Sequence, residues 1–531
     1  MARGKKSKRR VEAHEAVVEE IDEQGEAAPA PERAPKLRLK ATADLPTALP
    51  GPAAAALVFV AAGAVLMLEI LAVRLLAPYV GLTLETTTSI IGAALAGIAT
   101  GAAVGGYLAD RTDTKLLVVG LLVLGGLLTL LTVPIVHWLG PGARGSGDLA
   151  ALGITALALV PAAAVLSAVS PAVAHLQLHD LRASGTIVGR LSAWATAGAL
   201  LGTFGAGFVV IPLMPVGSAV LVIGLVLVLI GIALGMTTRL LAPAGIAGAL
   251  VATLAFGAFA ASADSPCLRE THYHCIELEA DPEDPNGEEL VLDNVHNSYV
   301  DLKDPTYLRY EYTNWIADAI DGYFPRRKPL DAVFVGGGGF TLPRWLLATR
   351  PGSEAEVLEV DGDLVEFDEE RLGLQTSADL RATVGDARMT MRNVPTDSAD
   401  VVVGDAFSGF TVPWHLTTRE WLEEMQRVLK PGGIYAANLI DVGPLDFIKW
   451  ESATFLDVFP EVKMITFINP ETGALYGGNI VLLGSNRKMS AKVASQAYGG
   501  VTYLKSAVEE LGAEGEVLRD DYAPVDQLRT E

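Results

Sequence analysis

Long apolar segments alternate with short polar ones between residues 51 and 262. About 20 consecutive apolar residues are enough for a helix to cross a lipid bilayer, and buried helices of soluble proteins seldom follow one another at this length. We therefore expect a multi-span α-helical membrane domain of about seven helices. The predicted spans cover 52–76, 87–108, 115–137, 149–175, 188–213, 217–236 and 240–262.

Within the second predicted span, Gly97, Gly101 and Gly105 recur at intervals of four residues. Small residues at this spacing share one face of a helix and allow a neighbouring helix to approach closely. This stripe predicts a helix-packing face.

The pattern changes in the C-terminal part of the chain. A short apolar run over 331–335 ends in a cluster of glycines that includes Gly336, Gly337 and Gly338, and a helical pattern follows over 341–349. Strand, glycine loop and helix in this order are typical of the first crossover in a nucleotide-binding α/β sheet. The glycines let the backbone approach a ligand, and the helix N-terminus offers free N–H groups.

Acidic residues follow the next predicted strands. Glu359 and Asp361 come after one strand, Asp386 and Ala387 after another, and Asp405 after the apolar run 399–404. Each acid alone could cap a helix or lie in a loop. At these intervals, however, they would share one edge of a parallel sheet, where ligands bind. We expect a Rossmann-like domain that binds a nucleoside, with acids at the ribose and at the adenine.

The charge distribution divides the chain into three regions. Residues 1–50 contain a basic cluster, a Glu-rich stretch and Pro/Ala-rich sequence, so we expect a disordered tail. Of the 531 residues only 19% are charged, and the net charge of −22 comes from residues 263–531, which hold 23 Lys/Arg and 47 Asp/Glu. An acidic region of this size repels nucleic acid, which we exclude as a partner.

The short loops between the predicted spans suggest an orientation. With the N-terminus in the cytoplasm, five basic residues lie on the inside, while Arg144 and, near a helix end, Arg74 lie outside. An excess of basic residues marks cytoplasmic loops. Seven spans would then place residues 263–531 outside the cytoplasm, in a multi-pass protein of the cell membrane.

Cys267 and Cys275 are the two cysteines of the chain, eight residues apart just after the last predicted span. An isolated pair at the start of an extracytoplasmic domain favours a disulfide. Two buried thiols are the alternative. We expect no metal site, because a zinc site that also uses His272 and His274 matches no usual ligand spacing.

At the level of motifs, the C-terminal part resembles the spermidine synthase family of polyamine aminopropyltransferases, and specifically relatives fused to a membrane region. The glycine cluster, the acids after it, the segment LEILAVRLLAPYVG in the first span and the closing DDYAPVDQL carry this resemblance. GYLADRTDTK, after the second span, resembles a cytoplasmic loop of major facilitator transporters. The resemblance implies a small β-domain over 271–302 and a methyltransferase-type Rossmann domain over 303–531.

The resemblance also implies roles for individual residues. Glu359 matches the ribose-binding acid, Asp386 and Ala387 the adenine-binding pair, and Asp405 the catalytic aspartate. Substrate-binding positions would be held by Tyr310, Asn297 and Ser408. The glycine loop lacks the aspartate usual in the family, and Ser408 replaces the second acid of its D-S-S-D segment, so two carboxylates that would bind cationic nitrogen in the family are missing here.

From this family we expect transfer of an aminopropyl group from decarboxylated S-adenosylmethionine to a polyamine such as putrescine. The donor, or S-adenosylmethionine, would be a co-substrate and no cofactor would be bound permanently. The lipid bilayer, a small-molecule amine and a second copy of the chain are the expected partners. A non-catalytic nucleoside or polyamine sensor, a transporter accessory and a methyltransferase are the alternatives.

Overall fold

The computed structural model describes residues 49–81, 84–144, 148–178, 184–469, 475–489 and 499–528. The predicted tail over 1–50 therefore lies almost entirely outside the described residues. Seven helical segments among the described residues are long and apolar enough to cross a membrane, judged by length and composition alone. They are Gly51–Val80, Thr86–Ala109, Thr114–Ala143, Val160–Gln177, Ser184–Leu213, Val216–Thr237 and Pro243–Ala261.

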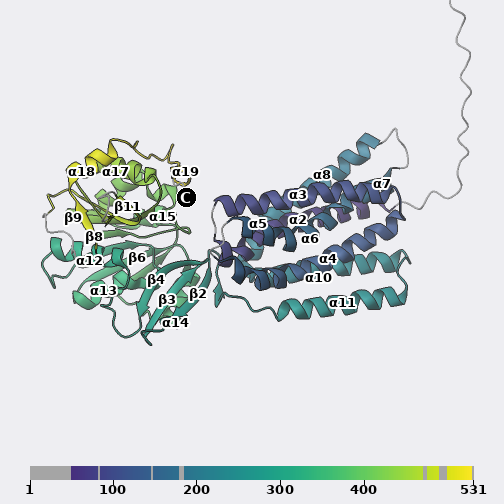
Figure 1. Cartoon of the computed structure of the whole chain (residues 1–531), viewed down its shortest axis with the longest axis horizontal. Helices are drawn as coiled ribbons and strands as arrows, with labels where there is room; N and C mark the ends of the chain where they lie inside the picture. Colours follow the sequence, from purple (N-terminus) through teal and green to yellow (C-terminus); the bar gives the residue numbers. More distant parts are fainter. Residues whose placement is uncertain are drawn as a thin grey trace, which may run out of the picture. The chain divides into compact units, whose positions relative to one another are not determined.

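The long helices of this region lie side by side (Figure 1), and close contacts at glycines bring them together. Helix α2 (Gly51–Val80) packs against α8 (Ser184–Gly205), and a Cβ on Gly198 would lie 2.1 Å from the carbonyl oxygen of Phe59. In α3 (Leu84–Ala109), a Cβ on Gly101 would lie 2.0 Å from the carbonyl oxygen of Ala164. The predicted packing face of α3 is therefore confirmed, because only glycine permits these backbone approaches.

The remaining helices of this region include one departure from the prediction. The segment 149–175 was expected as one span, whereas the structure divides it at Leu159 and Ala168, shortly before Pro161 and Pro171. Proline lacks the N–H that a helix needs and displaces the preceding turn. The pieces are α5 (Asp148–Ala158), α6 (Val160–Ser167) and α7 (Val169–Gln177); α4 (Thr114–Leu139), α9 (Ile211–Leu213), α10 (Val216–Thr237) and α11 (Pro243–Ala261) complete the region.

A four-stranded antiparallel sheet follows, in the order β1-β2-β3-β4. Its strands are β1 (Arg269–Glu270), β2 (Cys275–Ala280), β3 (Gly287–Leu292) and β4 (Val295–Asp301). A two-residue turn joins β3 to β4, with positive φ angles at Asp293 and Asn294, the residue types that tolerate this conformation best. Ile276, Leu290 and Leu292 form the buried face with Leu364 and Phe367 of the following α/β region.

The α/β region is built on an eight-stranded sheet in the order β12-β10-β11-β9-β8-β5-β6-β7. Five strands are parallel: β5 (Asp331–Val335), β6 (Glu354–Glu359), β7 (Leu380–Val384), β8 (Ala399–Gly404) and β9 (Leu429–Asp441). The antiparallel ones are β10 (Glu461–Ile468), β11 (Leu475–Ser485) and β12 (Val501–Tyr503). The order reverses beside β5, which places a topological switch point between β5 and β8.

Helices connect these strands and complete two hydrophobic clusters around the sheet. Near-continuous apolar strands such as 399–403, buried throughout, are what a sheet covered on both faces requires. The helices are α12 (Glu311–Tyr323), α13 (Thr341–Thr349), α14 (Gly362–Arg371), α15 (Ala387–Thr390), α16 (Arg419–Val428), α17 (Asp446–Val458), α18 (Lys505–Gly512) and α19 (Val525–Leu528).

Candidate active site

The glycine loop after β5 has a shape that side chains would prevent. Gly336 has a φ angle of 99°, and a Cβ there would lie 2.3 Å from the carbonyl oxygen of Asp405. Gly339 has a φ angle of 69°. Both angles lie in the region that favours glycine. The loop therefore lies against the end of β8.

Two neighbouring cavities open beside this loop. The larger has a volume of about 310 Å³ and the smaller about 170 Å³. Gly336, Gly337, Gly338, Asn297 and Asp405 line both of them. Because Asp405 belongs to both linings, a group bound in one cavity could meet a group bound in the other at this carboxylate.

Glu359 in the larger cavity is held by the backbone. One of its carboxylate oxygens accepts a hydrogen bond from Gly337 N at 2.6 Å, and the other accepts one from Asp361 N at 2.8 Å. Burial raises the pKa of Glu359, while the two backbone N–H groups oppose this rise. The acid thus fixes the position of the glycine loop as well as facing the cavity.

The structure places Asp361 differently from the sequence-based expectation. Asp361 lies outside the lining of both cavities and is 1% exposed. Its carboxylate caps α14 by accepting from the backbone N–H of Asp363 and of Leu364, and it also accepts from the Thr271 hydroxyl. This placement favours a structural role, and Glu359 remains the candidate for the ribose.

The other predicted nucleoside-binding residues do line the larger cavity. Asp386 accepts from Arg388 N at 2.8 Å and lies 3.3 Å from His415 Nε2, and Ala387 is beside it at the start of α15. Ser408 lines this cavity but not the smaller one. Apolar side chains supply the remaining wall that a flat base requires; they include Leu292, Leu358, Leu364 and Leu416.

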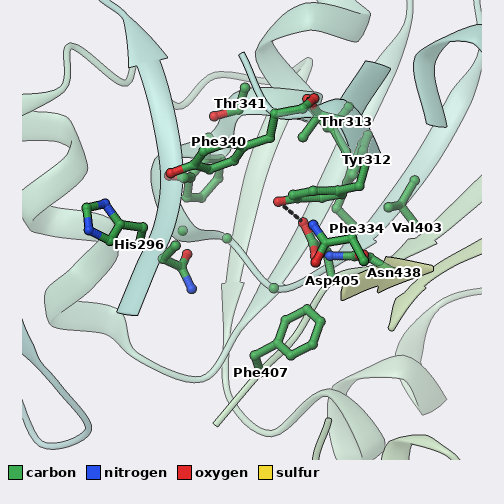
Figure 2. Close-up of a pocket in the computed structure, with 18 of the residues that line it drawn as sticks. His296, Tyr312, Thr313, Phe334, Phe340, Thr341, Val403, Asp405, Phe407 and Asn438 are labelled. Atoms are coloured by element: carbon green, nitrogen blue, oxygen red, sulfur yellow. Dashed lines mark hydrogen bonds between the residues drawn. The ribbon is translucent and has the colours of Figure 1, made fainter. Parts of the chain in front are cut away.

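Asp405 lies at the meeting point of the cavities and is held by two side chains (Figure 2). One carboxylate oxygen accepts from the Tyr312 hydroxyl at 3.1 Å, and the other accepts from Asn438 Nδ2 at 2.8 Å. The surrounding protein raises the pKa of Asp405 to about 6, although both hydrogen bonds lower it. The carboxylate is therefore more basic than that of an ordinary aspartate.

The smaller cavity also contains polar atoms that have no hydrogen-bond partner among the described residues. The Ser298 hydroxyl and Asn438 Oδ1 are in this state, and their residues are 5% and 3% exposed. Tyr310 and Asn297, both predicted to bind substrate, line the same cavity. Buried polar atoms without partners are costly, so this cavity is suited to a ligand that carries hydrogen-bonding groups.

Sequence reasoning missed four residues of this site. Tyr312 and Asn438 hold Asp405, while His274 and Asp293 line the larger cavity as a pair, with 2.9 Å between Nδ1 and the carboxylate. A signal existed for Asn438, since it interrupts the buried apolar strand β9. His274 was considered only as a zinc ligand, and no sequence signal marked Tyr312 or Asp293.

The cysteines and one side-chain cluster bear on metal binding. Cys267 and Cys275 are joined by a disulfide, so neither sulfur is a thiolate available to zinc. Among the described residues, Glu279, Glu289 and His296 bring three possible ligand atoms within 4.8 Å of one another on the four-stranded sheet. Two of these three side chains are exposed.

The chain is similar to a polyamine aminopropyltransferase of Vibrio vulnificus (strain CMCP6), with 30% identity over 152 residues. The match covers 28% of this chain and 50% of the relative, so the chain spans about half the length of the curated relative that it matches. No protein-family model matches the chain. The predicted likeness to aminopropyltransferases is therefore confirmed as sequence similarity over part of the chain.

Solved structures of similar proteins include two spermidine synthases. A probable spermidine synthase from Corynebacterium glutamicum ATCC 13032 shares 28% identity, with a TM-score of 0.44, over 48% of this chain and 95% of that one. A spermidine synthase in complex with the transition state analogue AdoDATO shares 18% identity, with a TM-score of 0.34, over 45% and 82% of the two chains. Neither comparison shows a fusion to a major-facilitator-like region.

Proposed function

We propose that this protein is an aminopropyltransferase that uses decarboxylated S-adenosylmethionine and an amine such as putrescine. Its support is the position of Asp405, a carboxylate of raised pKa that lines both cavities. The larger cavity would hold the adenosyl group, with Glu359 at the ribose and Asp386 and Ala387 at the adenine. The smaller cavity would hold the acceptor amine.

The reaction is a displacement at carbon. The nitrogen lone pair of the acceptor attacks the aminopropyl carbon bound to sulfur, a new C–N bond forms, and the C–S bond breaks. Sulfur keeps the bonding electron pair, which converts the sulfonium into the neutral thioether methylthioadenosine. Asp405 orients the attacking amine and accepts its proton. An alkyl amine has a pKa of about 10.4 in water, so binding beside a base is needed to expose its lone pair.

The decisive experiment uses the full chain purified in detergent. Given decarboxylated S-adenosylmethionine and putrescine, spermidine or other amines, it should release methylthioadenosine and the aminopropylated amine. A folded sample that binds methylthioadenosine but forms no product with any amine would favour the sensor instead. Release of S-adenosylhomocysteine from S-adenosylmethionine would identify a methyltransferase.

We also propose that the seven apolar helical segments anchor this enzyme in a membrane, with residues 263–531 outside the cytoplasm. Labelling of Cys267 and Cys275 in whole cells by an impermeant thiol reagent tests the side. Labelling is expected only after reduction, because the disulfide blocks both sulfurs. Labelling that requires opening of the cell would place this region in the cytoplasm.

A further inference from the structure

Two stacked tyrosines connect the smaller cavity to a second carboxylate. The rings of Tyr310 and Tyr312 lie 6.1 Å apart, with their planes 23° from parallel. The Tyr312 hydroxyl donates to Asp405, while the Tyr310 hydroxyl donates to Glu289 on β3. Both tyrosines line the smaller cavity. The stacked pair therefore positions one acid within the cavity and another beside it.

Glu289 is placed where a cation would be stabilised. Its direct cross-strand partner is Glu279 on β2, and carboxylates directly opposite each other repel. His296, which lines the smaller cavity, contributes Nδ1 at 3.0 Å from Glu289. Tyr310 and His296 both contact Glu289 and line the smaller cavity, whereas Glu289 lies outside that lining and its side chain is 25% exposed.

Independent features of the smaller cavity point to a ligand. The Ser298 hydroxyl and Asn438 Oδ1 line it without a hydrogen-bond partner among the described residues. Asn438 Oδ1 is an acceptor that an ammonium N–H can satisfy beside Asp405. An acceptor amine bound there would extend along the tyrosine pair toward Glu289.

Resting on the proposed function, we propose that Glu289 is the specificity-determining carboxylate of the acceptor site. It selects amines that carry a second ammonium group. The reacting nitrogen lies at Asp405, and the distal ammonium binds Glu289 between Tyr310, His296 and the facing Glu279.

The test compares the binding of two amines to the full chain with methylthioadenosine bound. 1,4-Diaminobutane and 1-aminobutane share a four-carbon chain and differ only in the second amino group. Calorimetric titration should show that the wild type binds the diamine about three- to fivefold more tightly, as expected for one partly exposed ion pair. Glu289→Gln should abolish this preference and leave the affinity for 1-aminobutane within twofold. Glu288→Gln is the matched control, because successive side chains of a strand point to opposite faces, and it should retain the preference.

Kinetics distinguish the subsite from the proposed reaction. If product forms, Glu289→Gln should raise KM for the diamine about three- to fivefold and change kcat little, since the residue is proposed to contact only the distal ammonium. Selective diamine binding without product would leave the Glu289 subsite standing and contradict the transferase. An equal preference in wild type and Glu289→Gln, or one that EDTA abolishes and that therefore belongs to a metal ion, would overturn the subsite.

Discussion

The two cavities hold their acids in different ways. In the larger cavity, Glu359 accepts from two backbone N–H groups and Asp386 from one. Asp405, which lines both cavities, is instead held by the side chains of Tyr312 and Asn438. Backbone donors belong to the fold and form a rigid binding surface, whereas side-chain donors can be changed by substitution without altering the chain path. The larger cavity is therefore suited to rigid binding, whereas substitutions of Tyr312 or Asn438 can change the basicity of Asp405.

Replacement of Asp405 should have the largest effect. Asp405→Asn removes the proton acceptor, so formation of methylthioadenosine should fall by about 10²-fold or more. Affinity for methylthioadenosine, measured by calorimetry, should stay within about threefold, because the adenosyl group is proposed to lie in the larger cavity. A parallel loss of binding would show that the cavities are not separable.

The same variant also has a predicted effect on stability. A carboxyl whose pKa is raised to about 6 in the folded state binds its proton more tightly than in the unfolded chain, so the wild type loses stability as pH rises from about 4 through 6. The loss is at most about 3 kcal/mol above pH 7. Asp405→Asn should therefore melt at a higher temperature than the wild type at pH 8, and this advantage should disappear near pH 4.

Glu359→Gln tests the backbone-held acid. The amide keeps one acceptor oxygen and places an NH2 group against a backbone N–H, so either Gly337 N in the glycine loop or Asp361 N loses its acceptor. We expect about tenfold weaker binding of methylthioadenosine, the cost of one unsatisfied buried donor. Glu354→Gln is the control, since Glu354 lies at the opposite end of β6. Unchanged affinity in Glu359→Gln would contradict the assigned role.

Tyr312→Phe should change basicity by a smaller amount. The Tyr312 hydroxyl lowers the pKa of Asp405, so its removal should raise that pKa above about 6. Because Asp405 acts in its ionised form, the acidic limb of the kcat/KM profile should move to higher pH by less than about one unit. Tyr323→Phe, whose hydroxyl bonds to Ser485, should leave the limb in place.

Asp361→Ala should affect ligand binding least. Loss of the cap on α14 should reduce stability by about 1 to 2 kcal/mol, while affinity for methylthioadenosine at a temperature where the variant is folded should change less than about threefold. A tenfold loss of affinity in a folded variant would return Asp361 to the ligand-binding residues.

The sequence alone predicted the elements and the edge of the sheet where the site lies. Apolar segments of about 20 residues predicted the long helices, and the glycine loop and the acids after successive strands predicted one ligand-binding edge. These features are readable because each depends on local spacing. Pro161 and Pro171, which follow the helix breaks at Leu159 and Ala168, were also visible in the sequence, but the continuous apolar pattern concealed their effect.

Only the tertiary structure decided which groups surround the reacting position. Tyr312 and Asn438 lie 93 and 33 residues from Asp405 in the chain and meet it only because strand order and helix placement bring them together. In the same way Asp361, two residues from Glu359, caps the N-terminus of α14 and lines neither cavity. Local pattern determines where a strand ends, but side-chain direction and long-range neighbours depend on how the whole sheet packs.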